Sequence, residues 1–541
     1  MKAILSIILI LMALNITKSQ VSQEWVVEYT GATTGSNKPI KSAIDCNGNF
    51  VVAGNSQAIN YDFVVIKYSP SGSIIWSKRY DGPGTNNDYL TGMVLDDSGN
   101  VYVCGKSWGV TTSYDWATIK YAAEDGREMW VRRFNWRTNL SDEPFGMCLD
   151  IDKNVYVVGM AAVNNLGKEM ITAKYSPNGD SVWTIPYRFN TIQNDWGYSV
   201  CVDSSLNVYS LGYTWREGYL AGNDITILKY DRDGNVMWIR KHPTNDGNYL
   251  IPILSQFDAA NNLVIVGNYS IQNYDFVTIK YSPEGKLLWT RIFDQGGTDR
   301  ANSLYLDESC NILIAGYNYN TLRGGDYMIL KYSPEGDTLL LKYINGQNEQ
   351  AYDEAYSALM DKFGNMYVTG MSENTSSRPD FYTFKLSPSG NIIWQVRYKD
   401  PPAPLPWINI AYCISLDSSY NVYVAGITSG NMTGPLVSIK YSQITGVSIN
   451  PETIILEMQI DNFPNPFNPV TTISYAIPQD GKVKITVYNS LGAKERELVN
   501  EYLSAGKYEV QFDGKELPSG AYYCILESSS RMLTRRILLV K

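Results

Sequence analysis

The 541-residue sequence is poor in the residues that most catalytic and metal sites use. It contains one histidine, His242, and seven cysteines, none of which stand in a CxxC spacing. Any Ser–His or Cys–His catalysis would have to use His242, and a zinc site would lack its usual ligands. The motifs GxGxxG, GxxxxGK[ST] and HExxH are absent, so nothing supports a nucleotide-binding or zincin function. We expect the cysteines to be mostly buried free thiols, with no essential disulfide.

Positive charge and long apolar runs are also scarce. The net charge of -9 and a pI near 5.0 argue against nucleic acid or an anionic membrane as a partner. The apolar run from Ala3 to Leu14 follows Lys2 and is short for a membrane span, so residues 1–19 predict a secretory signal peptide, with a membrane anchor as the alternative. No later stretch is long enough to cross a bilayer. The mature chain is expected to be soluble and monomeric.

What the sequence has is a repeated phrase rich in tyrosine, tryptophan and glycine. Phrases such as GNVYVCG and GNMYVTG return eight times, 49 to 56 residues apart. Their closing glycines are Gly54, Gly105, Gly159, Gly212, Gly267, Gly316, Gly370 and Gly426. Eight copies at this period indicate a solenoid, a propeller or an array.

One period reads as four short strands. In the first copy these are 42–45, 50–53, 62–68 and 74–80, joined by turns rich in Asn, Gly, Ser and Pro. Glycine accepts the positive φ that such turns need, and proline presets its own φ. Four antiparallel strands without helical periodicity predict the blade of a β-propeller.

The ends of the array predict how it closes. The lysine of the third strand occurs eight times, as Lys67, Lys120, Lys174, Lys229, Lys280, Lys331, Lys385 and Lys440. No fourth strand follows the last copy, whereas residues 23–29 (QEWVVEY) match residues 74–80 (IIWSKRY) near the start. We therefore expect an all-β fold in which residues 20–445 form an eight-bladed propeller and the N-terminal strand completes the last blade.

A tryptophan recurs in the fourth strand. Its copies are Trp25, Trp76, Trp130, Trp183, Trp238, Trp289 and Trp394, with Leu340 in the remaining repeat. Bulky rings at mid-strand predict a core between blades, whereas a cage that stacks on a ligand would need them at loop tips. His242 stands where other repeats have an aromatic residue, so we interpret it as part of a packing row.

The phrases DF..IKY, G...W and GN.YV.G resemble the SBBP family of bacterial β-propeller repeats over about residues 23–441. The resemblance implies the propeller fold. It implies little about activity, because a fold of this kind hosts many functions.

Acidic residues form two recurring sets. The first stands five residues before the lysine and consists of Asp62, Asp115, Glu169, Asp224, Asp275, Asp326 and Asp380. The second precedes the first strand and consists of Asp88, Asp142, Asp195, Asp246, Asp299 and Asp353. The first and third strands of a meander start at the same end, so both sets should lie on one face. Each acid either accepts backbone N–H bonds in its own turn or contributes to a surface that binds calcium or sugar hydroxyls.

Two segments of the array could carry binding. The segment 231–235 (DRDGN) superficially resembles a calcium loop, but it lacks the terminal glutamate and stands at an ordinary turn, so we predict a hairpin. The insertion 215–224 (WREGYLAGND) could contribute an edge for a ligand. No resident cofactor is expected, with calcium left open.

After a linker at 446–461, residues 462–541 alternate apolar and polar residues between turns, which predicts a β-sandwich of about seven strands. A generic fibronectin-like spacer is one interpretation. The run FPNPFNP, the later turn at Gly492 and the end LVK look like the C-terminal sorting domain, type A, of the type IX secretion system. The residues of the motif are Pro464, Asn465, Pro466, Phe467, Asn468, Pro469, Gly492, Ser519, Gly520 and Lys541.

This resemblance implies passage to the periplasm and then, through the type IX machinery, across the outer membrane. In that family the domain is often cleaved, which leaves the cargo released or attached to the surface. The sequence thus predicts a secreted or surface-bound, non-catalytic binding module for a glycan or protein ligand. The alternative is a hydrolase or lyase that acts on polysaccharide with carboxylates of the acidic face.

Overall fold

The computed structural model describes residues 20–31, 35–164, 166–189, 194–215, 222–243, 249–269, 275–320, 324–346, 351–374, 378–398, 407–430, 434–444, 458–477, 481–503, 506–528 and 531–541. The predicted signal peptide, residues 446–457 of the linker, most of the 215–224 insertion and Asp246 lie outside these residues. The chain forms two compact units, 1–444 and 445–541. No helix among the described residues is long and apolar enough to cross a membrane.

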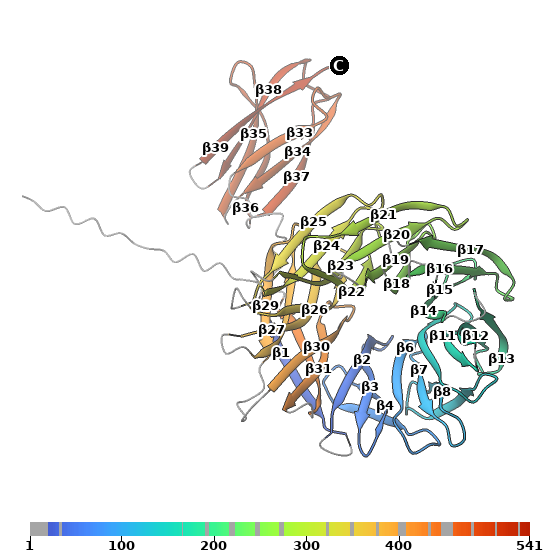
Figure 1. The fold of residues 1–541 in the computed structure, drawn as a ribbon. Coiled ribbons are helices and arrows are strands. Elements are labelled where there is room, and N and C mark those ends of the chain that lie inside the picture. The colour runs from blue at the N-terminus through green and yellow to red at the C-terminus, as the bar shows by residue number, and fades with distance from the viewer. Residues whose placement is uncertain are drawn as a thin grey trace, which may run out of the picture. The chain divides into compact units, whose positions relative to one another are not determined.

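The first unit contains eight four-stranded sheets in its described residues (Figure 1). Sheets 1 to 4 consist of β2 (Asn37–Ile44), β3 (Phe50–Gln57), β4 (Tyr61–Tyr68) and β5 (Ile74–Tyr80); β6 (Tyr89–Leu95), β7 (Val101–Trp108), β8 (Tyr114–Tyr121) and β9 (Glu128–Phe134); β10 (Asp142–Leu149), β11 (Val155–Val163), β12 (Gly167–Tyr175) and β13 (Ser181–Tyr187); and β14 (Trp196–Val202), β15 (Val208–Trp215), β16 (Asn223–Tyr230) and β17 (Val236–Pro243).

Sheets 5 to 8 follow the same order. They consist of β18 (Leu250–Phe257), β19 (Leu263–Tyr269), β20 (Phe276–Tyr281) and β21 (Leu287–Phe293); β22 (Thr298–Leu306), β23 (Ile312–Asn320), β24 (Gly324–Tyr332) and β25 (Thr338–Ile344); β26 (Asp353–Met360), β27 (Met366–Glu373), β28 (Pro379–Leu386) and β29 (Ile392–Tyr398); and β30 (Trp407–Leu416), β31 (Val422–Gly430), β32 (Leu436–Ile444) and β1 (Gln20–Tyr29). The all-β propeller that the sequence predicts is confirmed.

Sheet 8 joins the two ends of the array. The N-terminal strand β1 pairs antiparallel with β32, with Trp25 opposite Lys440 and Tyr29 opposite Leu436. The first strand of sheet 1, β2, in turn packs against β30 of sheet 8. The pairing predicted from the QEWVVEY match is therefore present in the structure.

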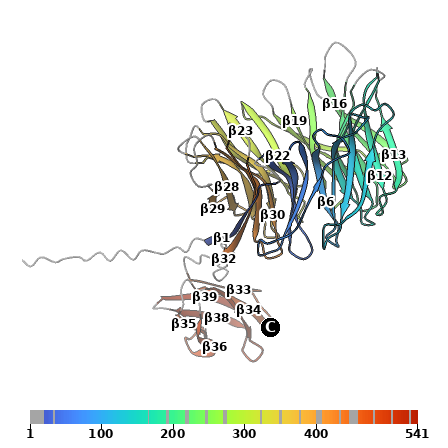
Figure 2. The same ribbon diagram turned by 90° about the horizontal axis from the view of Figure 1, so that it is seen from below.

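The first strand of each sheet lies nearest the middle of the array, and the strands of neighbouring sheets stand side by side (Figures 1 and 2). The second and third strands of a sheet are covered on both faces by its neighbours. In sheet 1 the residues of β3 and β4 are accordingly almost all buried, whereas the fourth strand, β5, exposes Ile74 and Ile75. The core is therefore a stack of sheet-to-sheet layers, built from the second and third strands.

Every first strand carries a β-bulge at the same place, directly after the residue that stands opposite the recurring glycine of the second strand. The register breaks, for example, between Pro39 and Lys41 in β2 and between Pro144 and Gly146 in β10. The residues left without a cross-strand partner are Ile40, Thr91, Phe145, Tyr198, Ile253, Asn302, Tyr356 and Tyr412. A bulge interrupts the strict alternation of a strand and re-aims its side chains.

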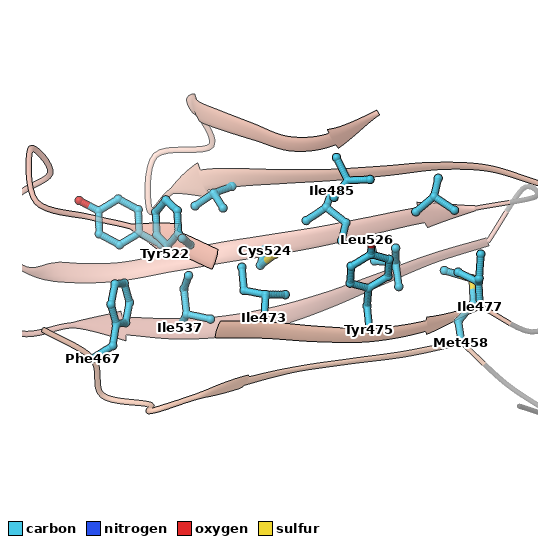
Figure 3. Close-up of a cluster of buried hydrophobic side chains, with 14 of the residues drawn as sticks. Met458, Phe467, Ile473, Tyr475, Ile477, Ile485, Tyr522, Cys524, Leu526 and Ile537 are labelled. Atoms are coloured by element: carbon cyan, nitrogen blue, oxygen red, sulfur yellow. The ribbon is translucent and has the colours of Figure 1, made fainter. Parts of the chain in front are cut away.

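The second unit is a β-sandwich. One sheet has the order β33 (Gln459–Phe463), β34 (Val470–Ile477) and β37 (Gly506–Asp513), and the other β36 (Lys494–Leu503), β35 (Gly481–Asn489), β38 (Gly520–Ser528) and β39 (Arg531–Leu539). Its core contains Phe467, Ile473, Ile485, Leu526 and Ile537 (Figure 3). These seven strands agree with the predicted number, but β33 starts at Gln459, inside the predicted linker.

Candidate functional site

The propeller sheets have two ends with different chemistry. We call the end at which the first and third strands begin the acid end, and the opposite end, with the hairpin turns that follow the first and third strands, the turn end. The residues that recur from repeat to repeat are distributed between these two ends.

At the turn end, the recurring lysine and tryptophan hold the neighbouring sheet. Lys67 Nζ and Trp76 Nε1 both donate to the carbonyl oxygen of Ala123 in the next sheet, at 2.7 and 3.2 Å. In sheet 8, Lys440 and Trp25 donate in the same way to Pro70 of sheet 1. The repeated lysine, turn and tryptophan thus form a clamp between sheets, which agrees with the predicted packing role of the tryptophan row.

The turn end also contains a third acid row that the sequence reasoning missed. Asp45 Oδ1 accepts the N–H groups of Asn47 and Asn49, and its Oδ2 lies 2.6 Å from Lys67 Nζ. The equivalent residues are Asp45, Asp96, Asp150, Asp203, Asp258, Asp307, Asp361 and Asp417. Burial raises the pKa of Asp45, but hydrogen bonds from Lys67 and Asn49 outweigh this and hold it below its usual value. An aspartate four residues before an asparagine in every repeat was the available signal.

At the acid end, the acids that precede the first strands are structural caps. Asp88 is fully buried, and its two oxygens accept the N–H groups of Gly82 at 2.6 Å and Trp108 at 2.8 Å. Backbone N–H groups of the connection between sheets are bound in the same way by Asp142, Asp195, Asp299 and Asp353. This is the own-turn arrangement that the sequence suggests. Burial raises the pKa of Asp142 to about 7 and that of Asp195 and Asp353 to about 6.

The acids that begin the third strands bind differently, because four of them form ion pairs with arginines near or just beyond the end of the fourth strand. Asp62 lies 2.5 Å from Arg79 Nε, because Arg79 stands opposite Val64 and is therefore a diagonal neighbour of Asp62 on the same side of the sheet. The same diagonal pairs are Asp115–Arg133 at 2.8 Å and Asp380–Arg397 at 3.8 Å, whereas Glu169 pairs at 2.9 Å with Arg188, which follows the end of β13. Asp224 and Asp326 are also buried at this end.

The position of Arg79 is occupied by other residues in sheets 3 to 6, namely Pro186, Lys241, Ile292 and Tyr343. In sheet 5 the described residues contain no ion pair to Asp275. One carboxylate oxygen from each of Asp275, Asp294 and Asp299 lies within 4.8 Å of the others. Burial and then the two neighbouring carboxylates raise the pKa of Asp275 to about 6. A second such group, Asp62 with Asp81 and Asp88, already has Arg79 beside it.

His242 lies in the packing row, as the sequence predicts. Its ring stands edge-on to Tyr281, with Nδ1 3.3 Å from the hydroxyl, and burial lowers its pKa. The segment at Asp231 is a hairpin turn in which Asp231 accepts from Asn235, and all seven cysteines are free thiols.

Two aromatic groups on and beside the innermost strands escaped the sequence reasoning. The aromatic cluster consists of Phe145, Trp196, Tyr198 and Tyr213, with ring centroids 5.1 to 6.3 Å apart. Lys168 Nζ lies 3.7 Å from the centre of the Trp196 ring. These side chains belong to sheets 3 and 4 and are half-buried.

The second group surrounds Glu354 in sheets 6 to 8. This buried carboxylate accepts hydrogen bonds from Asn302 at 2.9 Å, Tyr352 at 3.1 Å and Tyr356 at 2.8 Å. The ring of Tyr356 contacts that of Tyr412 at 5.0 Å. We call these five residues the Glu354 cluster. The sequence signal for these two groups was weak, because aromatic residues in strands normally indicate a hydrophobic core.

In the second unit the predicted motif residues support the C-terminal strand. Asn465 accepts from Leu538 N at 3.0 Å and donates to Arg536 O at 3.2 Å, and Phe467 is buried beside Leu539. Thr471 donates to Pro464 O, and Gly514 donates to Pro469 O. Pro466 and Asn468 lie between these contacts.

The other motif residues hold turns and the chain end. Gly492 has a φ of 80°, which favours glycine in the turn between β35 and β36. Ser519 Oγ accepts from Lys541 N at 3.0 Å, and Gly520 begins β38. The motif therefore ties the last strand of the chain into the sandwich.

Two family models match this chain. Residues 461–541 match the secretion system C-terminal sorting domain, and residues 75–110 match the beta-propeller repeat of the SBBP type. The C-terminal unit is a type IX sorting domain. Such a domain engages the type IX secretion machinery and marks a protein for export to the cell surface or the extracellular space. The propeller is therefore the cargo that this domain carries.

Other likenesses are remote. A curated uncharacterized WD repeat-containing protein of Acanthamoeba polyphaga mimivirus is 22% identical over 504 residues, covering 76% of this chain and 34% of its own length, so the chain spans about a third of that relative. A quinohemoprotein alcohol dehydrogenase from Comamonas testosteroni is 12% identical over 82% of this chain and 80% of its own, with a TM-score of 0.48. PorZ of Porphyromonas gingivalis is 11% identical over 91% of this chain and 68% of its own, with a TM-score of 0.36. Likenesses at this level say nothing about activity.

Proposed function

We propose that the exported propeller is a non-catalytic binding module, and that its ligand contacts the acid end of the innermost strands. The observation that carries the proposal is that two kinds of side chain occur at this end, one recurring and one present in only some sheets. Most of the recurring carboxylates there are held by arginines or backbone N–H groups, whereas the aromatic cluster and the Glu354 cluster occur in only a few sheets.

This division separates scaffold from site. A residue of the framework keeps its contacts from sheet to sheet, as Asp88, Asp142 and Asp195 do. Residues that differ between repeats are not required in every sheet, and half-buried aromatic rings with charged neighbours are typical of ligand-contacting surfaces. A carboxylate already paired with an arginine is also poorly suited to donate or abstract a proton.

One observation favours the alternative of a polysaccharide-active hydrolase. Asp275, Asp294 and Asp299 bring three carboxylates together without an arginine, and the raised pKa of Asp275 suits a general acid. We keep this as a second candidate, with Asp275 as proton donor.

Both candidates can be tested on the full chain with a glycan array followed by product analysis, each with calcium and with a chelator. The binding module predicts capture of at least one glycan without a change in its length. Release of shorter or unsaturated products that is lost in Asp275→Asn would replace the binding module by the enzyme. Absence of product, together with no capture on the glycan array or on a peptide array, would overturn both.

A further inference from the structure

Two pairs of contacting rings occupy the bulge position of the first strands. Phe145 in sheet 3 contacts Tyr198 in sheet 4 at 5.1 Å, and Tyr356 in sheet 7 contacts Tyr412 in sheet 8 at 5.0 Å. The pairs are four sheets apart in an array of eight, so they lie on opposite sides of its middle (Figure 1). In the other four sheets this position holds Ile40, Thr91, Ile253 and Asn302.

Lysines accompany these rings. Lys38, an exposed side chain of sheet 1, has its Nζ 4.4 Å from the centre of the Tyr412 ring. On the other side, Lys168 lies over Trp196, which contacts both Phe145 and Tyr198. In a protein with a net charge of -9, positive groups placed beside half-buried rings are a local exception to the overall charge.

The Glu354 cluster fixes one ring pair in place. Tyr356 donates its hydroxyl to the buried Glu354 carboxylate, which also accepts from Asn302 and Tyr352. A ring held by a hydrogen bond to a neighbour loses little further freedom when a ligand stacks on it, which improves affinity.

We propose that the innermost strands bind an acidic saccharide, such as a uronic acid polymer, and this deepens the binding function proposed above. The rings of Tyr198 and Tyr412 contact the apolar C–H faces of sugar rings, and Lys168 and Lys38 pair with the sugar carboxylates. Burying a C–H face against an aromatic ring removes apolar area from water, and each ammonium adds a charge-assisted hydrogen bond. A neutral saccharide would use the rings and leave the two lysines unpaired.

Polygalacturonate is a suitable probe, because methyl esterification neutralises its carboxylates and keeps the sugar backbone. For the full chain we expect binding of the acid form in low salt, at least about tenfold weaker binding of the fully esterified form, and weakening with added salt. Lys168→Gln and Lys38→Gln should each weaken binding about three- to tenfold, and Tyr198→Ala or Tyr412→Ala about tenfold or more.

Matched controls come from the turn end. Lys362→Gln changes an exposed lysine, and Tyr305→Ala changes a half-buried tyrosine of the first strand β22 at that end. Both should leave binding unchanged. Thermal unfolding verifies the fold of each variant, and Tyr198→Leu replaces Tyr198→Ala should the latter unfold.

The outcomes separate the two proposals. Equal binding of the acid and esterified forms, or wild-type affinity in all four lysine and tyrosine variants, would overturn the acidic-saccharide site while leaving a glycan-binding module intact. Capture of peptides but of no saccharide would overturn the saccharide inference alone. Failure to capture any ligand would also overturn the proposed function.

Discussion

The two ends of the propeller sheets repeat to different degrees. At the turn end, the lysine, the tryptophan and the third acid row recur with nearly the same partners from sheet to sheet, for example at Lys67, Lys229 and Lys280. At the acid end, the arginine of the third-strand pair is replaced by isoleucine in sheet 5, and aromatic residues gather in only some sheets.

This difference indicates at which positions the sequence must repeat from sheet to sheet and at which positions it can vary. The turn end holds most sheets to the next through this clamp, although sheet 6 has Leu340 in place of the tryptophan. At the acid end, the acids that precede the first strands accept the backbone N–H bonds. The side chains at the innermost positions are therefore free to differ from sheet to sheet. Repetition therefore marks the scaffold, and departures from it mark candidate sites.

The largest loss of stability should come from breaking the clamp between sheets. Lys67→Met removes both the ion pair to Asp45 and the bond to Ala123, and it leaves a buried carboxylate without its partner. We expect the free energy of unfolding to fall by about 3–5 kcal/mol, measured by urea denaturation. The exposed Lys362→Met serves as the control, and a loss below about 1 kcal/mol for Lys67→Met would show that the clamp is not what holds the sheets.

The two ends should also respond oppositely to pH. Burial raises the pKa of Asp142 to about 7, so its contribution to stability is full below pH 4 and is lost as the pH rises through 7. The lowered pKa of Asp45 gives a contribution that is present at neutral pH and lost only in acid. We expect Asp142→Asn to reduce the decline in the free energy of unfolding between pH 5 and pH 8 by roughly 2 kcal/mol.

Denaturation curves at pH 5 and pH 8 measure this, with Asp45→Asn as the comparison. The Asp45 variant should lose stability at both pH values. An unchanged pH dependence in Asp142→Asn would contradict the raised pKa.

The sequence predicted what depends on backbone pattern. The match between residues 23–29 and 74–80 identified the pairing of the N-terminal strand with the last blade, because strand edges and repeat phase follow from alternation and turns. It did not predict the Asp62–Arg79 pair, since that contact depends on the register of two strands and on a diagonal neighbour. Nor did it separate Tyr198 and Tyr412 from core residues, because a bulge re-aims side chains without changing the strand pattern.

A smaller loss of stability should follow from removing only one hydrogen bond of the clamp. Trp130→Phe keeps a buried ring against Gly179 but removes the bond from Nε1 to Pro177 O, which measures 3.1 Å. We expect a loss of about 1 kcal/mol in the free energy of unfolding. The exposed neighbour Met129→Leu should change nothing, and a loss equal to that of Lys67→Met would mean that ring shape matters more than the bond.

The smallest change in stability should come from placing an arginine in sheet 5 at the position that Arg79 has in sheet 1. Ile292→Arg places a guanidinium where Arg79 stands in sheet 1, beside the three carboxylates of Asp275, Asp294 and Asp299. We expect a gain of up to about 1 kcal/mol in stability, and the loss of any rise in melting temperature that calcium gives to the wild type. A calcium effect that survives in Ile292→Arg would place the cation elsewhere.

The pairing of β1 with β32 has a consequence for how the chain is made. Ser22 and Ser442, which touch across this seam, are 420 residues apart in sequence. Synthesis delivers β1 first and its partner almost last, so the seam must wait until nearly the whole array has emerged, and contacts so distant in sequence form slowly. Until then the edge of β1 is an unpaired strand, open to pairing with other chains. A chaperone that shields this edge, or a seam mutation that delays its closing, would therefore govern the yield of folded propeller more than its final stability.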